Sequence, residues 1–207
     1  LMPALDSGGL KVVVNDEYAP DVKDLTATLT KIKQAAPDAV LSLSYPPDSI
    51  LYIKGARELN IKSPFQLALV GPTEYFFSKM FGTNLDGIVT MGHWSPHQTK
   101  WPKARPFYDA YMKKYGEPPD YLDSALAWMS IEILQQAVKT AGLDKNKIRQ
   151  AISTETFDTI DGPVKFKGVE NILTPTMFLQ FQRGEAQIVW PGSEATAHFE
   201  PKPEWTK

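Results

Sequence analysis

Four short apolar runs of this 207-residue chain are each followed by residues that could bind a small molecule. The runs are rich in β-branched and other apolar side chains, which is typical of strands buried in a parallel sheet. Ligands of open parallel sheets bind beyond the carboxyl ends of the strands. We therefore expect the site at the residues that follow the runs, which are Glu17-Tyr18, Ser44-Tyr45, Pro72-Thr73-Glu74 and His93-Trp94.

These positions combine aromatic rings, hydroxyls and two carboxylates. That mixture suits a small organic ligand with an apolar body and a polar head. The alternative for Tyr18 and Tyr45 is that each ring only packs over its own loop. Asp120 and Asp123 lie at the start of a long predicted helix, where acidic side chains also interact favourably with the helix dipole.

Catalytic motifs are missing from the sequence. It contains no GxSxG elbow, no phosphate-binding loop and no dinucleotide fingerprint. A nucleophile at the strand ends would need a base beside it, and His93 is the one candidate. His93 and His97 have the spacing of a metal pair, but Pro96 lies between them and no HExxH pattern is present. We expect a binding protein without catalytic residues, metal or cofactor.

The composition is that of an ordinary globular protein, with 43% hydrophobic and 22% charged residues. The net charge is −2 and the pI is near 6.0, which argues against nucleic acid or an anionic membrane surface as the main partner. No apolar run reaches the ~18 residues of a membrane span, so we expect no stable membrane insertion. The absence of cysteine excludes a disulfide scaffold and a thiol nucleophile.

Strands and helices alternate in the first half of the sequence. The predicted helices begin near Asp24, Asp48 or Ser49, and Thr73. This alternation with short links favours a parallel sheet covered by helices on both faces. The predicted strands are Leu10–Asn15, Ala39–Ser44, Phe65–Val70 and Gly87–Met91.

The pattern changes after the fourth strand. Residues 93–106 contain three prolines and no periodicity, which indicates a crossover. Apolar residues at helical spacing then predict three helices, and alternation and turn residues predict a short strand and a hairpin before an extended, proline-rich tail. The helices are expected near 106–115, 120–141 and 144–154, the strand at 164–167, and the hairpin at 178–190.

The first residues of the chain resemble the end of a helix. Leu1–Leu5 is followed by Gly8-Gly9, a typical glycine C-cap. We therefore expect that a further segment precedes this chain in the natural protein.

Several motifs follow one another in a fixed order. KVVVND leads into a helix that ends in KIK, followed by PDAV and a strand that ends at Tyr45. LALVGPTEYFF, GTNLDGIVTMG and the helical FYDAYMKKYGEPPDYLDSALAWM come next, and FDTIDGPVKF precedes the hairpin. Together these motifs resemble the leucine/isoleucine/valine-binding family of periplasmic solute-binding proteins, over essentially the whole chain.

The resemblance implies a type I periplasmic-binding-protein fold, in which two α/β lobes close over the ligand by hinge motion. Residues 1–92 would form part of the second lobe and 93–106 the crossover. Residues 107–163 would be a helical return belonging to the first lobe, and 164–207 the C-terminal strands, hairpin and tail. The first lobe would be incomplete, so we expect the chain alone to bind ligand weakly or not at all.

The resemblance also implies a function and a set of contacts. Such proteins capture a small molecule in the periplasm and deliver it to the permease of an ABC transporter. We expect a branched-chain or other hydrophobic amino acid, with an aromatic or aliphatic carboxylate, or a sensor role, as alternatives. The family's tyrosine falls on Tyr45 and its acidic residue on Thr73, with Glu74 one position later. Its first-lobe aromatic contact falls near Tyr121 or Asp123, and Trp94 on the crossover could wall the cleft.

Overall fold

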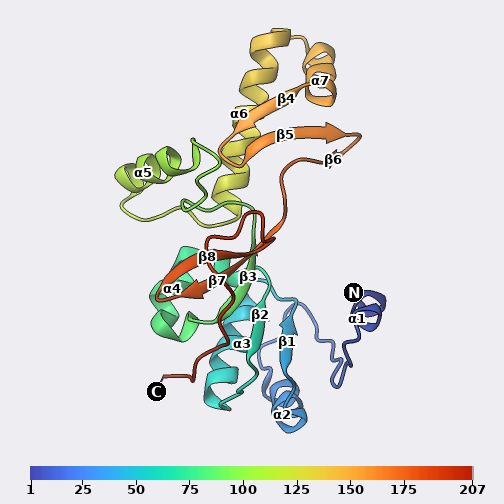
Figure 1. Cartoon of the computed structure of the whole chain (residues 1–207), viewed down its shortest axis with the longest axis vertical. Helices are drawn as coiled ribbons and strands as arrows, with labels where there is room; N and C mark the ends of the chain where they lie inside the picture. The colour runs from blue at the N-terminus through green and yellow to red at the C-terminus, as the bar shows by residue number, and fades with distance from the viewer. Residues whose placement is uncertain (207) are drawn as a thin grey trace.

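The computed structural model describes residues 1–206 and contains a five-stranded sheet with strand order β1-β2-β3-β7-β8 (Figure 1). The first three strands are parallel, β7 pairs antiparallel with β3, and β8 pairs antiparallel with β7. They span Ala39–Ser42 (β1), Phe65–Ala68 (β2), Ile88–Gly92 (β3), Met177–Gln182 (β7) and Glu185–Trp190 (β8). The predicted parallel strands at β1, β2 and β3 are thus confirmed. The predicted hairpin extends the same sheet, which its sequence did not indicate.

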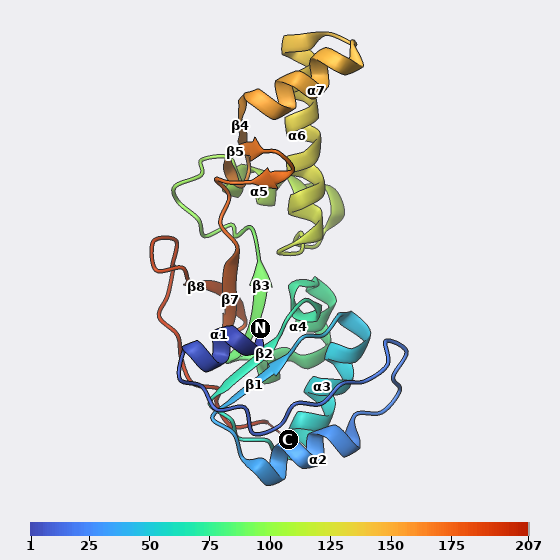
Figure 2. The same ribbon diagram turned by 90° about the vertical axis from the view of Figure 1, so that its right-hand side faces the viewer.

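Helices α2 (Thr26–Ala35), α3 (Pro46–Glu58) and α4 (Tyr75–Phe81) lie on one side of this sheet (Figure 2). Two short 3-10 helices, η1 (Gly71–Thr73) and η2 (Gly82–Leu85), flank α4. The other face of the sheet is exposed at Leu41 of β1 and at Leu43, which follows the strand. Helices therefore cover one face of the sheet at its β1 edge.

The predicted strand at Leu10–Asn15 is wrong. The segment runs from helix α1 (Met2–Ser7) towards α2 without regular structure, and it pairs with no strand among residues 1–206. Leu10, Val12 and Val13 are exposed. An apolar, β-branched run becomes a strand only when a partner strand supplies hydrogen bonds and a buried face, and neither is present here. Helix α1 itself ends at Ser7 with Gly8 as its C-cap, as the glycines predicted.

A second part of the molecule contains α5 (Ala104–Tyr115), α6 (Asp123–Ala141), α7 (Lys145–Thr154) and a small antiparallel sheet (Figure 1). That sheet consists of β4 (Thr156–Thr159), β5 (Gly162–Lys167) and β6 (Glu170–Asn171). The three predicted helices are confirmed, and Asp144 caps α7 by accepting from the amides of Asn146 and Lys147 at 2.9 and 3.1 Å. Residues 164–207 were expected to form one unit. In the structure, β5 and β6 belong to the small sheet, whereas β7 and β8 belong to the five-stranded sheet.

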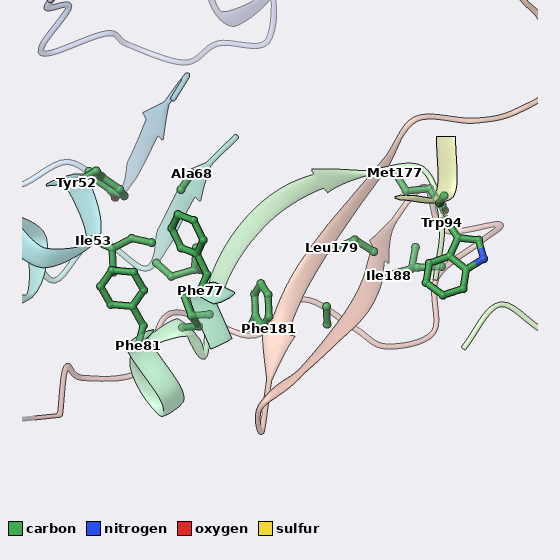
Figure 3. Close-up of a cluster of buried hydrophobic side chains, with 14 of the residues drawn as sticks. Tyr52, Ile53, Ala68, Phe77, Phe81, Trp94, Met177, Leu179, Phe181 and Ile188 are labelled. Carbon is green, nitrogen blue, oxygen red and sulfur yellow. The ribbon is translucent and has the colours of Figure 1, made fainter. Parts of the chain in front are cut away.

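The larger of two buried hydrophobic clusters extends across both parts, and a smaller cluster lies between α6, α7 and the small sheet. Residues 93–103 and 172–176 cross between them, and the loop 116–122 reaches the five-stranded sheet through Tyr121. Trp94 and Ile188 lie in the same buried cluster as Phe77 and Phe81 (Figure 3). The crossing segments are therefore packed against the main sheet and hold the strand ends in place.

The C-terminal tail is extended, as predicted, and lies against the opposite ends of the strands. The Lys202 amide donates to the Pro64 carbonyl at 2.8 Å, and the Trp205 indole nitrogen donates to the Ile61 carbonyl at 2.8 Å. The tail thus contacts the end of the sheet far from the predicted site.

Candidate ligand-binding site

Ser44 joins the ends of β1 and β2. Its side chain is fully buried, and its hydroxyl lies 2.7 Å from that of Ser49 in α3. Its carbonyl accepts the Val70 amide at 3.1 Å. A Cβ on Gly71 would lie 2.4 Å from the Ser49 Cβ, so only glycine allows this approach. Ser44 therefore supports the strand end, and its hydroxyl is not exposed to a ligand.

Tyr45 begins helix α3 directly after this strand. Its side chain is 69% exposed at the sheet end. Its amide donates to the Asp48 carboxylate at 3.0 Å, an arrangement that fixes the backbone at the start of the helix. Of the predicted residues at the β1 end, Tyr45 offers the most surface to a ligand.

Tyr18 reaches the same place from the extended segment before α2. Its hydroxyl donates to the second Asp48 oxygen at 2.7 Å. Burial, followed by the hydrogen bond and the negative charge of Asp48, raises the pKa of Tyr18 to about 12. Tyr18 therefore stays neutral at physiological pH. The sequence indicated Asp48 only as a helix cap. The residues around Asp48 give no sign that Tyr18, 30 residues away, is its hydrogen-bond partner.

Thr73 lies at the end of β2, in η1. It is buried, and its hydroxyl donates to the Val70 carbonyl at 2.7 Å. Its own carbonyl accepts the Tyr121 amide at 3.1 Å. Thr73 thus connects the main sheet with the loop before α6, and its hydroxyl already has a partner.

Glu74 follows Thr73 and faces two further carboxylates. Its pKa is raised, first by burial and then by the charges of Asp120 and Asp123. Asp120 caps α6 by accepting the amides of Leu122 and Ser124, each at 3.0 Å, whereas Asp123 is exposed. Three acidic side chains therefore produce a negative potential at the β2 end, which favours a ligand cation.

Trp94 does not wall a cleft in this structure. Its ring is completely buried at the β3 end, 5.4 Å from the ring of Phe107 and 6.4 Å from that of Tyr108. The expectation fails because a large aromatic surface between two packed parts is removed from water rather than left at their border.

Tyr121 also points into the core. Its ring centroid lies 6.5 Å from those of Trp94 and Phe181, and burial raises the pKa of Tyr121 to about 12. Its backbone is what reaches the strand ends: the amide donates to the Thr73 carbonyl, and the carbonyl accepts the His93 amide at 3.3 Å.

The predicted site residues thus divide into two groups, a buried frame and an accessible set. The frame is Ser44, Thr73, Trp94 and Tyr121, and the accessible set is Tyr18, Tyr45, Glu74 and Asp123.

No metal site emerges among the described residues. Within residues 1–206, no three His, Cys, Asp or Glu side chains are grouped so that they could hold a metal ion. The two histidines with metal-like spacing have other surroundings: burial lowers the pKa of His93, and His97 lies 3.7 Å from Glu185. Over the same residues, no helix has the length and apolarity to cross a membrane.

An apolar hollow of about 740 Å³ lies away from the strand ends, between α5 and α6. It is lined mainly by aromatic and aliphatic side chains, including Phe107, Tyr111, Tyr115, Trp128 and Ile131. The adjoining face of α6 exposes Trp128, Ile131 and Leu134 by 52, 63 and 45%. An exposed apolar surface of this kind marks a place where another part of a protein packs.

A family model described as periplasmic binding protein matches residues 2–184. Among curated proteins, the chain is 27% identical over 208 residues to "Leu/Ile/Val-binding protein homolog 7" of Brucella suis, covering 94% of this chain and 51% of that protein. It is 26% identical over 210 residues to "Leu/Ile/Val-binding protein homolog 8" of Brucella abortus, covering 92% and 50%. The chain therefore spans about half the length of the curated relatives it matches.

Solved structures show the same fold. A leucine binding protein from Thermotoga maritima superposes with a TM-score of 0.78 at 23% identity, over 90% of this chain and 53% of that chain. A branched-chain amino acid transporter substrate binding protein from Streptococcus pneumoniae, in complex with isoleucine, gives 0.77 at 22% identity, over 92% and 56%. An ABC transporter solute binding protein from R. palustris, in complex with benzoate, gives 0.78 at 18% identity, over 99% and 54%.

Proposed function

We propose, from the premise that this chain belongs to the periplasmic binding protein family, that it forms one side of the ligand site of an ABC-importer solute receptor. The observation that carries the proposal is the accessible set of Tyr18, Tyr45, Glu74 and Asp123 beyond the carboxyl ends of the parallel strands. These side chains offer aromatic surface and negative charge, without a nucleophile and base in contact. The function is therefore capture of a small molecule rather than its conversion.

The ligand that fits this surface best is a hydrophobic amino acid. Tyr18 and Tyr45 offer an aromatic surface for an apolar side chain. The negative potential of Glu74, Asp120 and Asp123 suits an ammonium group. The curated relatives are called Leu/Ile/Val-binding protein homologues, and one related structure holds isoleucine, which supports this choice.

A carboxylate without an ammonium group is the second candidate. It is favoured by the related structure that holds benzoate. An aromatic acid could stack against the same tyrosines, but its carboxylate would have to point away from Glu74 and Asp123. The two candidates therefore differ in whether they use the acidic end of the site.

The part from α5 to β5 fits the first lobe of such a receptor. The exposed apolar face of α6 and the adjoining hollow would be unfavourable in water, since each Å² of apolar surface left exposed forgoes about 25 cal/mol. We propose that the remainder of the first lobe packs here in the full-length protein. The range 107–163 would then belong to that lobe, and the crossing segments 93–103 and 172–176 would form the hinge region.

A receptor of this kind acts outside the cytoplasmic membrane. We place the full-length protein in the periplasm, where it would deliver its ligand to the permease of an ABC transporter. The support is the family membership and the printed names of the relatives. A pull-down of the permease encoded nearest to the receptor's gene would test the partner.

The test of the proposed function is a thermal-shift screen of the full-length protein against hydrophobic amino acids and aromatic carboxylates. A ligand at about 100 times its dissociation constant should stabilise the protein by ~2.7 kcal/mol, which is readily measured. Tyr45→Ala should reduce that shift, because Tyr45 supplies the most exposed ring of the site. No shift with any ligand would contradict the proposal, and an equal shift in the variant would remove Tyr45 from the site.

A further inference from the structure

Asp48 connects two tyrosines that come from separate parts of the chain. One carboxylate oxygen accepts the Tyr45 amide at 3.0 Å, and the other accepts the Tyr18 hydroxyl at 2.7 Å. Asp48 lies in the first turn of α3, where the helix dipole favours its negative charge. Each of its oxygens thus holds one tyrosine, and the carboxylate lies at the point where the two segments meet.

The segment that carries Tyr18 has no regular structure, and it is attached to the core through Tyr18, Val22 and Leu25. Residues 9–25 form neither helix nor strand. Asp16 binds the Thr28 hydroxyl at 2.6 Å and the Lys31 ammonium at 3.1 Å, which fixes the segment to α2 rather than to the site. The bond from Tyr18 to Asp48 is therefore the polar contact that orients this ring beside the β1 end, where the ring also packs against the core.

Both polar groups of this arrangement are occupied. The Tyr18 hydroxyl has Asp48 as its acceptor, so the ring offers its apolar surface to a ligand. The Asp48 carboxylate has one donor on each oxygen, so both oxygens are already used within the protein. The β1 end is consequently the aromatic end of the site, and Glu74 with Asp123 is the acidic end.

We propose that Asp48 is a positioning residue that sets the affinity of the receptor by holding Tyr18 and Tyr45 against the apolar part of the ligand. The inference rests on the proposed function and goes beyond it, because it assigns a role to a residue that does not itself face the ligand.

The test is a mutant cycle in the full-length receptor, measured by calorimetry with an amino acid that the wild type binds. Asp48→Ala should weaken binding by about five- to tenfold, as expected for the loss of one to two hydrogen bonds. In the background Tyr18→Phe with Tyr45→Ala, the same change should alter the dissociation constant less than about twofold, because residues that act through one another are not additive. Asp48→Asn, which keeps one acceptor oxygen, should fall between wild type and Asp48→Ala.

Asp24 provides the matched control. It lies just before α2 and accepts backbone and side-chain donors at that helix start, the Thr26 amide at 2.8 Å and the Thr26 hydroxyl at 2.6 Å, and it contacts neither tyrosine. Asp24→Ala should lower the melting temperature to a similar degree and leave the dissociation constant unchanged.

The outcomes separate the two proposals. If the wild type binds the ligand and Asp48→Ala binds it equally tightly, the positioning role is overturned and the proposed function still stands. An equally large loss in the tyrosine-deficient background would also overturn the positioning role, since the effect would then be general damage to α3. A wild type that binds no ligand would overturn the proposed function, and the positioning role with it.

Discussion

The polar side chains at the strand ends differ in whether their hydrogen-bonding groups are already occupied. Ser44 and Thr73 use their hydroxyls within the protein. Tyr45 and Glu74 keep surface that a ligand can contact. Types of residue at strand ends were predictable from the sequence, but these partners were not. The Ser44–Ser49 pair depends on α3 folding back against β1, and the bond from Tyr18 to Asp48 spans 30 residues.

Gly71 is a residue whose substitution should disturb both stability and the site. A Cβ there would lie 2.4 Å from the Ser49 Cβ and 2.7 Å from the Phe77 ring, in a packed core. Gly71→Ala should therefore lower the free energy of unfolding by about 1–3 kcal/mol, as overpacking does. Denaturant unfolding followed by circular dichroism would measure this. Gly192→Ala, where nothing lies within 4 Å of the new Cβ, is the control and should leave stability unchanged.

Asp161 should make stability fall as the pH rises. It is fully buried and neither carboxylate oxygen has a partner. Burial, with a smaller contribution from Glu132, raises the pKa of Asp161 to about 8 from an ordinary value of 3.8. Between these values the folded state binds a proton that the unfolded state has lost. Each pH unit in that window therefore lowers the free energy of unfolding by about 1.4 kcal/mol.

Asp161→Asn removes this titration, so the variant should gain stability relative to wild type as the pH rises from about 4 to about 8. The measurement is thermal unfolding of both proteins across that range. Asp6→Asn, at an exposed position on α1, provides the control. Parallel pH profiles for wild type and Asp161→Asn would show that Asp161 is ionised or has a partner in solution.

Among the elements, those defined by local patterns were predicted well and those that need distant partners were not. The helical periodicity of α6 and the glycine cap that ends it are local, so the helix was predicted to within a few residues. Leu10–Asn15 has the composition of a buried strand, yet strand formation depends on a neighbour that composition does not reveal. The same reason explains why the hairpin β7–β8 was predicted but not its place beside β3.

The C-terminal tail is an element whose contribution was not evident from its composition. The buried amides of Gln180 and Gln182 donate to the carbonyls of Glu200 and His198, each at 2.7 Å. Together with the Trp205 contact, these bonds attach the tail to the sheet.

Removal of the residues after Ala197 should therefore lower the free energy of unfolding by roughly 2–4 kcal/mol, at about 1 kcal/mol for each lost hydrogen bond. Differential scanning calorimetry would show it as a lower melting temperature. Glu204→Ala is the matched control within the tail. It breaks only the exposed ion pair with Lys62, and such pairs contribute little. A melting temperature unaffected by the truncation would mean that the tail is detached in solution.

The whole molecule has the form of two parts joined by crossing segments, with an apolar face on α6 that the described residues leave exposed (Figure 1). The chain spans about half the length of its curated relatives. In a receptor of two lobes, each lobe supplies part of the ligand contacts, and closure adds them together. We therefore expect that this chain holds the tyrosine and acidic side of the site and depends on the other lobe for high affinity.

The most direct measurement is isothermal titration calorimetry of a hydrophobic amino acid such as isoleucine into the full-length protein and into this 207-residue chain. We expect a micromolar or tighter dissociation constant for the full-length protein, equivalent to about −8.2 kcal/mol or better. For the chain alone we expect binding at least about a hundredfold weaker, a difference of about 2.7 kcal/mol. Equal affinities would contradict a site shared between two lobes, and no binding of amino acids or carboxylates by the full-length protein would contradict the receptor function itself.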